Sequence, residues 1–269
     1  MTLKKATATL ALCVPAMAAH AQDWTSSVGY QHHSSKSTLS TNPSNSSFDA
    51  ISLSLTRKLD GQTFLGGSIA YNQGDSTTPR NSGTSDHVAT SGAVYVVRDL
   101  GSGWVADASL GYGTLRFDGN YLNAATPTFF KVSPDFWMVG AGLTHIKPLN
   151  PSVVASVSAR VSHAISNSSA HTDTAGASYA GSRTDRTSMS LGGGLIWLLG
   201  SWRPSVNVQY QRSNRNHLAG VSDKDHISYS LGLSHALSAK HTLSVGYASV
   251  AGKKFSQENS LSFALGSRF

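Results

Sequence analysis

The sequence predicts an all-β protein, a transmembrane antiparallel β-barrel of about 12 strands. Three observations predict this fold. The chain begins like a secretory signal, apolar and polar residues then alternate with a period of two in many segments, and the connections between these segments alternate between short and long. No apolar run after the signal is long enough for a membrane-spanning helix, so strands are left as the spanning elements.

Residues 1–21 are predicted to be a signal peptide. Two lysines precede the short apolar segment ATATLALCVPAMAA, and Ala19 and Ala21 fit the small-x-small pattern of a cleavage site. We expect cleavage after Ala21. Residues 22–269 are then expected to form one domain, the outer-membrane β-barrel.

The amino-acid composition limits the kinds of chemistry and the kinds of partner that we expect for this protein. The single cysteine, Cys13, lies inside the signal segment, so neither disulfides nor thiolate chemistry are expected in the barrel. Only 13% of the residues are charged, and the net charge of +7 is not gathered in a basic run. We therefore expect no nucleic acid and no cofactor, and we expect outer-membrane lipid and lipopolysaccharide as partners.

The first six predicted strands become less regular along the chain. In the second strand, Ile51, Leu53 and Leu55 alternate with serine and threonine. From the fourth to the sixth strand the apolar phase switches, which indicates bulges or displaced strand ends within residues 86–147. The six strands are residues 24–33, 48–59, 63–73, 87–99, 104–118 and 136–147.

The last six predicted strands alternate more clearly. One face of the seventh carries only valine and alanine, and in the tenth Ile227, Tyr229 and Leu231 alternate with serine and glycine. The twelfth strand ends at Phe269, the last residue. The six strands are residues 153–165, 186–199, 202–213, 225–237, 241–250 and 260–269.

The connections predict which end of the barrel faces which side. Connections after even-numbered strands are short (LDGQ, DLGSG, KPLNP, LGS, LSAK), whereas several after odd-numbered strands are long and polar, such as SSKSTLSTNPSNSS. Short turns on the periplasmic side and long loops outside are typical of barrels in the bacterial cell outer membrane. A spanning sheet must close on itself in lipid, so the last strand is expected to pair with the first. A soluble β-sandwich is the alternative, but it would not explain the signal and the loop asymmetry.

Alternation also predicts which charged and amide side chains line the barrel interior. They are Lys58, Asp107, Arg160, Arg186, Arg203, Gln209 and Gln211. Inward charges must be hydrated or paired. Arg160, Arg186 and Arg203 are expected either to form a cationic stripe that favours anions in a pore, or to join Asp107 in a network that fills a narrow interior.

The C-terminal third resembles the translocator β-domain of autotransporters. The stretch SYSLGLSHALSAKHTLSVGYASVAGKKFSQENSLSFALGSRF carries the pattern: a strand with a short turn, the strand HTLSVGY, a loop, and a final strand that ends in phenylalanine. The resemblance implies that the barrel-assembly machinery recognises Phe269 during insertion. Because the first strand begins soon after the expected cleavage site, we expect a barrel without a secreted passenger.

Three functions remain open from the sequence. The first is a small channel or structural barrel, the second is a surface interaction protein that acts through loops such as residues 34–46 and 167–182, and the third is a lipid-modifying enzyme. Histidines and aspartates expected near the outer rim show no recognisable catalytic spacing, so no enzyme and no catalytic residue are predicted. His32–His33 and the group Asp223, Asp225 and His226 could each contribute to a metal site, but strand-end residues are the favoured interpretation of both. Oligomeric state and solute are left open.

Overall fold

The computed structural model of the chain describes residues 24–38, 43–79, 82–123, 126–214, 217–218, 221–222, 225–253 and 256–269. The predicted signal peptide, with Ala19 and Ala21, lies outside these residues, as does Asp223. No helix in the described part of the chain is both long and apolar enough to cross a membrane.

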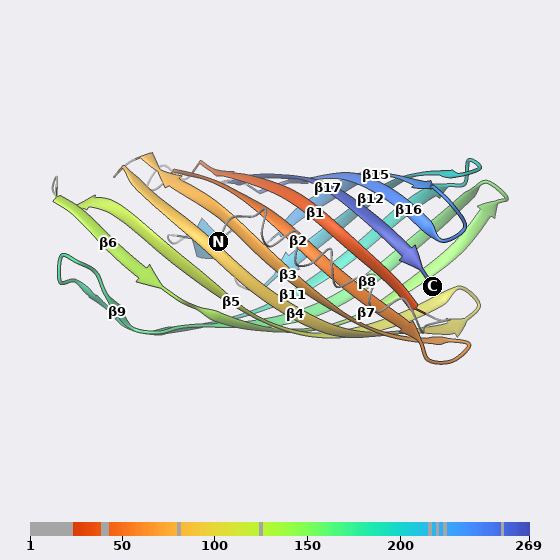
Figure 1. Ribbon diagram of the computed structural model, residues 1–269, viewed down its shortest axis with the longest axis horizontal. Helices are drawn as coiled ribbons and strands as arrows, with labels where there is room; N and C mark the ends of the chain where they lie inside the picture. Colours follow the sequence, from red (N-terminus) through yellow and green to blue (C-terminus); the bar gives the residue numbers. More distant parts are fainter. Residues whose placement is uncertain are drawn as a thin grey trace.

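Twelve strands close into one antiparallel barrel within the described residues (Figure 1). Each strand pairs with its two neighbours, and the ring closes where β4 pairs with β5 and where β1 pairs with β17. The ring consists of β1 (Trp24–Ser37), β2 (Ser44–Lys58), β3 (Thr63–Thr78), β4 (Gly83–Gly101), β5 (Trp104–Asn123), β7 (Asp135–Asn150), β8 (Val153–Ser168), β11 (Ser182–Trp197), β12 (Trp202–Ser213), β15 (Asp225–Ala236), β16 (His241–Ala251) and β17 (Ser256–Arg268).

Each of the twelve predicted strands corresponds to one strand of the ring, which confirms the predicted fold class. The observed strands run further at the outer end than the alternation indicated. β1 extends to Ser37 and β2 begins at Ser44, so much of the stretch predicted as a long loop is paired strand. Serine pairs stabilise these extensions, as in the 2.7 Å hydrogen bond between the hydroxyls of Ser35 and Ser46.

Short segments extend the architecture beyond the ring. β6 continues β7 in the same register against β5, because Phe117 pairs with Val132 and Thr114 with Asp135. Only Ser133 and Pro134 separate the two, and proline has no N–H to donate to a ladder. The shorter strands are β6 (Thr126–Val132), β9 (His171–Thr172), β10 (Ser178–Tyr179), β13 (His217–Leu218) and β14 (Val221–Ser222).

The first and last strands close the barrel along their whole length. The pairs between β1 and β17 run from Thr25 with Arg268 to Ser37 with Ser256. The ladder continues to the last residue, because the Phe269 amide donates to the Trp24 carbonyl at 2.9 Å. The sequence-based expectation that the terminal strands pair is therefore confirmed.

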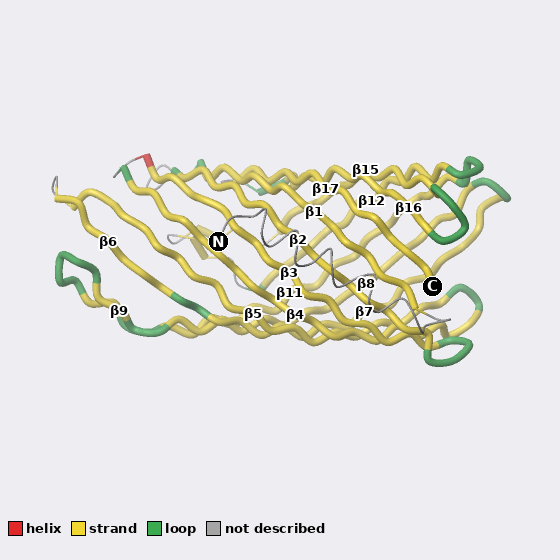
Figure 2. Tube along the Cα trace, viewed as in Figure 1, coloured by secondary structure: helices red, strands yellow, loops and turns green. Residues whose placement is uncertain are grey.

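The two ends of the barrel differ in the way the sequence predicts. Tight turns join β2 to β3, β4 to β5, β7 to β8, β11 to β12 and β15 to β16 at the end where the C-terminus lies (Figure 2). The turn after β4 is bulged at Asp99 and Gly101, and Gly101 and Gly103 both have positive φ angles near 80°. Glycine tolerates this conformation at no steric cost. Apart from the bulge at this turn, the pairings of the strands within residues 86–147 run in continuous register, so the irregular apolar phase there reflects apolar side chains on both faces, such as Val94 and Tyr95 on β4.

Alternation gives the barrel an apolar outer face and a polar inner face. Val157 and Leu191 are 64% and 63% exposed, as expected for side chains on a convex surface that would face lipid. On the other face, side chains from strands two places apart meet. Tyr95 of β4 reaches Thr56 of β2, and Arg160 of β8 reaches Asp107 of β5. Such contacts require a concave wall, so this face is the interior.

Candidate functional site

An ion pair lies on the inner wall where β5, β7 and β8 run side by side. Arg160 forms an ion pair with Asp107, and its Nη2 donates to the Ser109 hydroxyl at 2.9 Å. Gly142 of β7 lies between them, and a Cβ there would collide with the Asp107 carboxylate. The side chains of Arg160 and Asp107 are 38% and 27% exposed, so the pair is partly hydrated. One arginine charge is thereby largely balanced inside the barrel.

Two further polar contacts lie on the same inner wall. The Tyr95 and Thr56 hydroxyls are 2.5 Å apart, and the Tyr95 ring lies over Gly66. On the opposite side of the barrel, the Gln209 amide donates to the Ser190 hydroxyl at 2.9 Å. These contacts hold longer side chains against the wall, because each is bonded to another strand of the wall rather than projecting into the centre.

The other predicted interior residues are spread along the barrel axis. Arg203 is the second residue of β12, at the short-turn end, whereas Arg186 is near the start of β11, at the opposite end. Lys58 is exposed at the end of β2. Arg160 is paired in register with Ser190, four residues along β11 from Arg186. The structure therefore brings only Arg160 of the three arginines to Asp107 and does not gather them into one stripe.

Several inner side chains are too exposed for a filled interior. Met138, which is paired with Gly111 and Ala164 on the inner face of the wall, has 43% of its surface exposed. Asn207, also on this face, is exposed as well. Because these residues lie within the strands rather than at a rim, their exposure indicates open space in front of them.

At the outer end, the β9–β10 hairpin is hydrogen-bonded to the β5–β6 arm, which consists of β6 and the paired residues 117–123 of β5. Asp173 is only 5% exposed, and its carboxylate accepts hydrogen bonds from Tyr121 at 2.7 Å and from Tyr179 at 3.2 Å. Thr174 adds two bonds to the Phe129 backbone, at 2.9 and 3.0 Å. These donors lower the pKa of Asp173, with the Tyr121 hydrogen bond as the largest cause. The pKa of Tyr121 is raised, first by its hydrogen bond with the Tyr179 hydroxyl and then by its hydrogen bond to Asp173.

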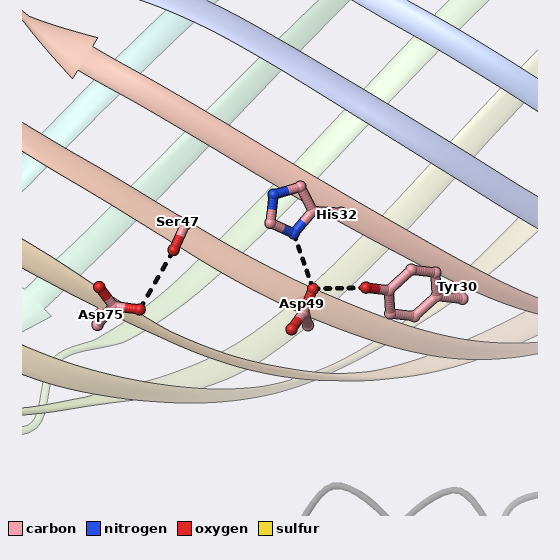
Figure 3. A network of polar contacts seen from close by, with 5 residues as sticks. All are labelled: Tyr30, His32, Ser47, Asp49 and Asp75. Carbon is pink, nitrogen blue, oxygen red and sulfur yellow. Dashed lines mark hydrogen bonds and ion pairs between the residues drawn. The ribbon is translucent and has the colours of Figure 1, made fainter.

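A second polar cluster lies on the outer face of β1 and β2 (Figure 3). Asp49 accepts hydrogen bonds from Tyr30 at 2.7 Å and from His32 Nδ1 at 2.9 Å. The nearby Ser47 hydroxyl donates to Asp75 at 3.2 Å instead. A Ser–His–Asp arrangement needs the serine within hydrogen-bond reach of the histidine. Among the described residues of this cluster, no such bond joins a serine to His32, so the cluster is not a Ser–His–Asp arrangement.

No metal site can be built from the part of the chain that the structure describes, since no group of three or more His, Cys, Asp or Glu side chains is suitably placed. His32 is bonded to Asp49, and His33 instead stacks on Phe48 with ring centroids 4.6 Å apart. Adjacent residues of a strand point to opposite faces, so the two histidines cannot share an ion.

The comparisons with known proteins identify the family. The family model described as the autotransporter beta-domain matches residues 24–248. The chain belongs to this family. The resemblance inferred from the C-terminal strands is thus confirmed over most of the barrel, and the autotransporter β-domain implies a Gram-negative outer membrane. No relative was found among curated proteins.

Solved structures support the same fold. The translocator domain of the autotransporter NalP from Neisseria meningitidis has a TM-score of 0.82 at 12% identity, with 99% of this chain and 95% of that chain covered. The β-domain of the Bordetella autotransporter BrkA has a TM-score of 0.68 at 16% identity, with 91% and 99% covered. The Ralstonia pickettii toluene transporter TbuX has a TM-score of 0.56 at 11% identity, with 93% and 90% covered. At these identities the likeness shows the fold alone.

Sequence reasoning missed two residues of the autotransporter β-domain interior. Tyr95 and Met138 were not identified as interior residues, because apolar or aromatic side chains were expected to face lipid. Their inward position depends on strand phase in the irregular region between β4 and β7. A signal was nevertheless present in the glycines, since Gly66 and Gly142 each leave room for a large inner side chain from the next strand.

Proposed function

We propose that this autotransporter β-domain forms a water-filled pore for small hydrophilic solutes in the bacterial cell outer membrane. The observation that carries the proposal is the exposure of the inner wall, above all of Met138, which is 43% exposed in the middle of a strand. A 12-stranded ring is also wider than the 8-stranded barrels that side chains can fill.

The inner charges favour anions in such a pore. Arg160 is balanced by Asp107, whereas Arg186, Arg203 and Lys58 leave a surplus of positive charge among the predicted interior residues. A unit charge about 4 Å from an ion in water contributes ~1 kcal/mol. This corresponds to a roughly fivefold change in local ion concentration, and high salt should weaken it. Selectivity is therefore expected to be modest.

Single-channel recording in planar bilayers tests the pore. Wild type is expected to give a steady open current with anion preference, and Asp107→Asn should strengthen this preference because it leaves Arg160 unbalanced. Arg160→Ala should weaken the preference and raise the conductance. Arg212→Ala is the matched control, since Arg212 also lies 3.7 Å from an aspartate, Asp225, but shares the outward phase of Tyr210. A sealed bilayer with folded wild-type protein would reject the pore.

A surface interaction role is the second candidate, and one observation favours it. The β5–β6 arm continues past the end of β7 and is fastened by Asp173 to the β9–β10 hairpin, which gives an ordered outer surface. Loss of cell-surface binding on replacing residues 167–182, with conductance unchanged, would support this role.

Partners and catalysis are likewise proposals. We infer that lipopolysaccharide surrounds the outer rim, that the barrel-assembly machinery inserts the chain through its last strand and Phe269, and that the protein has no enzymatic activity. Assays for lipid hydrolysis with the refolded protein check the last point, and turnover that disappears in His32→Ala would contradict it.

A further inference from the structure

A groove of about 780 Å³ lies on the outer face of β2–β5, on the side that would face lipid. Its walls are apolar, and its floor is low because Gly67 and Gly92 have no side chains. Both glycines lie on the outer face, since Gly67 is paired with Leu55 and Gly92 with Ile69. The walls include Leu53, Leu55, Leu65, Val94 and Leu110.

The groove is long enough for one acyl chain. It runs from Leu59, in the periplasmic turn after β2, up to Tyr112 on β5, which lies eight residues above Trp104 at the same rim. At ~3.4 Å per residue and a tilt of about 40°, this distance is roughly 20 Å along the membrane normal. One leaflet of the hydrocarbon core is about 15 Å thick, so a chain entering from the periplasmic side would fit.

The periplasmic end of the groove carries a positive charge. Arg57, the only charged residue among the described groove residues, lies near the end of β2 with its guanidinium 5.6 Å from the centre of the Trp24 ring. The cation–π contact holds the guanidinium at the level where tryptophan prefers the membrane interface. Guanidinium groups bind phosphate oxygens strongly and in bidentate geometry.

The opposite end is closed by aromatic rings. Tyr112 and Trp137 are packed with their centroids 4.6 Å apart and present no cation. A lipid of the outer leaflet would need its phosphate at this end. The charged residue, Arg57, is at the periplasmic end instead, so the groove fits a lipid of the periplasmic leaflet.

We propose that the groove is a binding site for one glycerophospholipid of the periplasmic leaflet. One acyl chain lies over Gly67 and Gly92, and the phosphate lies against Arg57 beside Trp24. The site is separate from the pore, because it is on the other face of the sheet, so either proposal can fail alone.

A substitution whose side chain fills the groove tests the position of the acyl chain. The Cβ of Gly92→Val would lie 3.6 Å from its nearest heavy atom, the Ser68 carbonyl oxygen, so the substitution fits the backbone. Gly193→Val is the matched control, because its Cβ would also lie 3.6 Å from a carbonyl oxygen, that of Ser156. Gly193 is paired with Val208 on the outer face of the opposite wall and does not line the groove.

A second pair of variants tests the phosphate position. Arg57→Gln removes the charge at the groove, and Arg98→Gln removes an exposed charge that shares the outer face of β4 and does not line the groove. Both residues lie near the periplasmic rim, where a glutamine is tolerated. This pair also keeps the test decisive if Gly92→Val fails to fold.

The measurement is the number of phospholipids retained by the full chain. Protein refolded into vesicles of phosphatidylethanolamine and phosphatidylglycerol is extracted in detergent and analysed by native mass spectrometry, after heat-modifiable migration has shown that each variant is folded. Wild type, Gly193→Val and Arg98→Gln are expected to retain one phospholipid. Gly92→Val should lose it, and Arg57→Gln should bind it about tenfold more weakly.

Two results would overturn the proposal. Equal retention by Arg57→Gln and Arg98→Gln, together with equal retention by any folded Gly92→Val and Gly193→Val, would show that lipid binds elsewhere. A wild-type dimer without lipid that becomes a monomer in Gly92→Val would show that a second copy of the chain occupies the groove instead.

Discussion

The contact between Tyr95 and Gly66 predicts a steric effect on stability. The Tyr95 ring lies over Gly66 so closely that a Cβ at this glycine would be within 2.5 Å of both the ring and the hydroxyl. In Gly66→Ala the ring must therefore lift away from the wall. Its 2.5 Å contact with the Thr56 hydroxyl is then lost.

The size of the effect follows from three contributions. A lost hydrogen bond costs about 1 kcal/mol, and overpacking against a ring costs about 1–3 kcal/mol. Alanine lowers the freedom of the unfolded chain, which offsets about 0.5–1 kcal/mol. The free energy of unfolding of Gly66→Ala is thus expected to fall by about 1–3.5 kcal/mol.

Urea unfolding in lipid or detergent, followed by tryptophan fluorescence, measures this change. Gly67→Ala is the control, because its Cβ on the outer face would lie 3.4 Å from the Ala93 carbonyl oxygen and should leave stability within about 0.5 kcal/mol. Adding Gly66→Ala to Tyr95→Ala should cost almost nothing, since the ring is gone. The reasoning is refuted if Gly66→Ala costs the same with and without the tyrosine.

Three further predictions concern the turns, the outer hairpin and the last residue. The pKa of Asp173 is lowered by its hydrogen bonds, so the ionised carboxylate stabilises the β9–β10 hairpin. This stabilisation is fully present above pH 3.8 and is lost as the pH falls through the lower folded-state pKa. Amide exchange at Thr174 should rise there, and Asp173→Asn should show no such pH step. Asp60 accepts the Gln62 and Thr63 amides at 2.7 and 2.6 Å, so Asp60→Ala should destabilise the β2–β3 turn by roughly 1 kcal/mol in urea unfolding. Deleting Phe269 should lower insertion into outer membranes more than it lowers refolding in detergent, and equal losses would contradict a recognition role.

Much of the architecture could be predicted from the sequence. Alternation places Ile51, Leu53 and Leu55 on one face whatever the rest of the chain does, because successive residues of a strand point to opposite sides. An apolar outer face in lipid then requires closure, so the pairing of the first and last strands followed from the same pattern. The turn positions were also readable, since short segments rich in Gly, Pro, Asn and Asp can only join adjacent strands.

The outer ends of the strands were harder to predict. The stretches after residues 33 and 73 lack apolar alternation, yet β1 and β3 continue to Ser37 and Thr78. Above the membrane neither face needs to be apolar, so periodicity no longer indicates a strand. Whether a segment there belongs to a strand depends on hydrogen bonding to the neighbouring strands.

What the sequence by itself determined is the set of strands, the order in which they pair and, outside the region from β4 to β7, which face of each strand is apolar. What only the tertiary structure decided is which inner residues meet. Arg160 reaches Asp107 across Gly142, Tyr95 reaches Thr56 across Gly66, and Arg186 and Arg203 are kept apart at opposite ends. The physical reason is register: a shift of two residues keeps every side chain on its face but moves it about 7 Å along the wall. Such a shift exceeds the length of any hydrogen bond, so contacts across the barrel depend on the closed sheet as a whole.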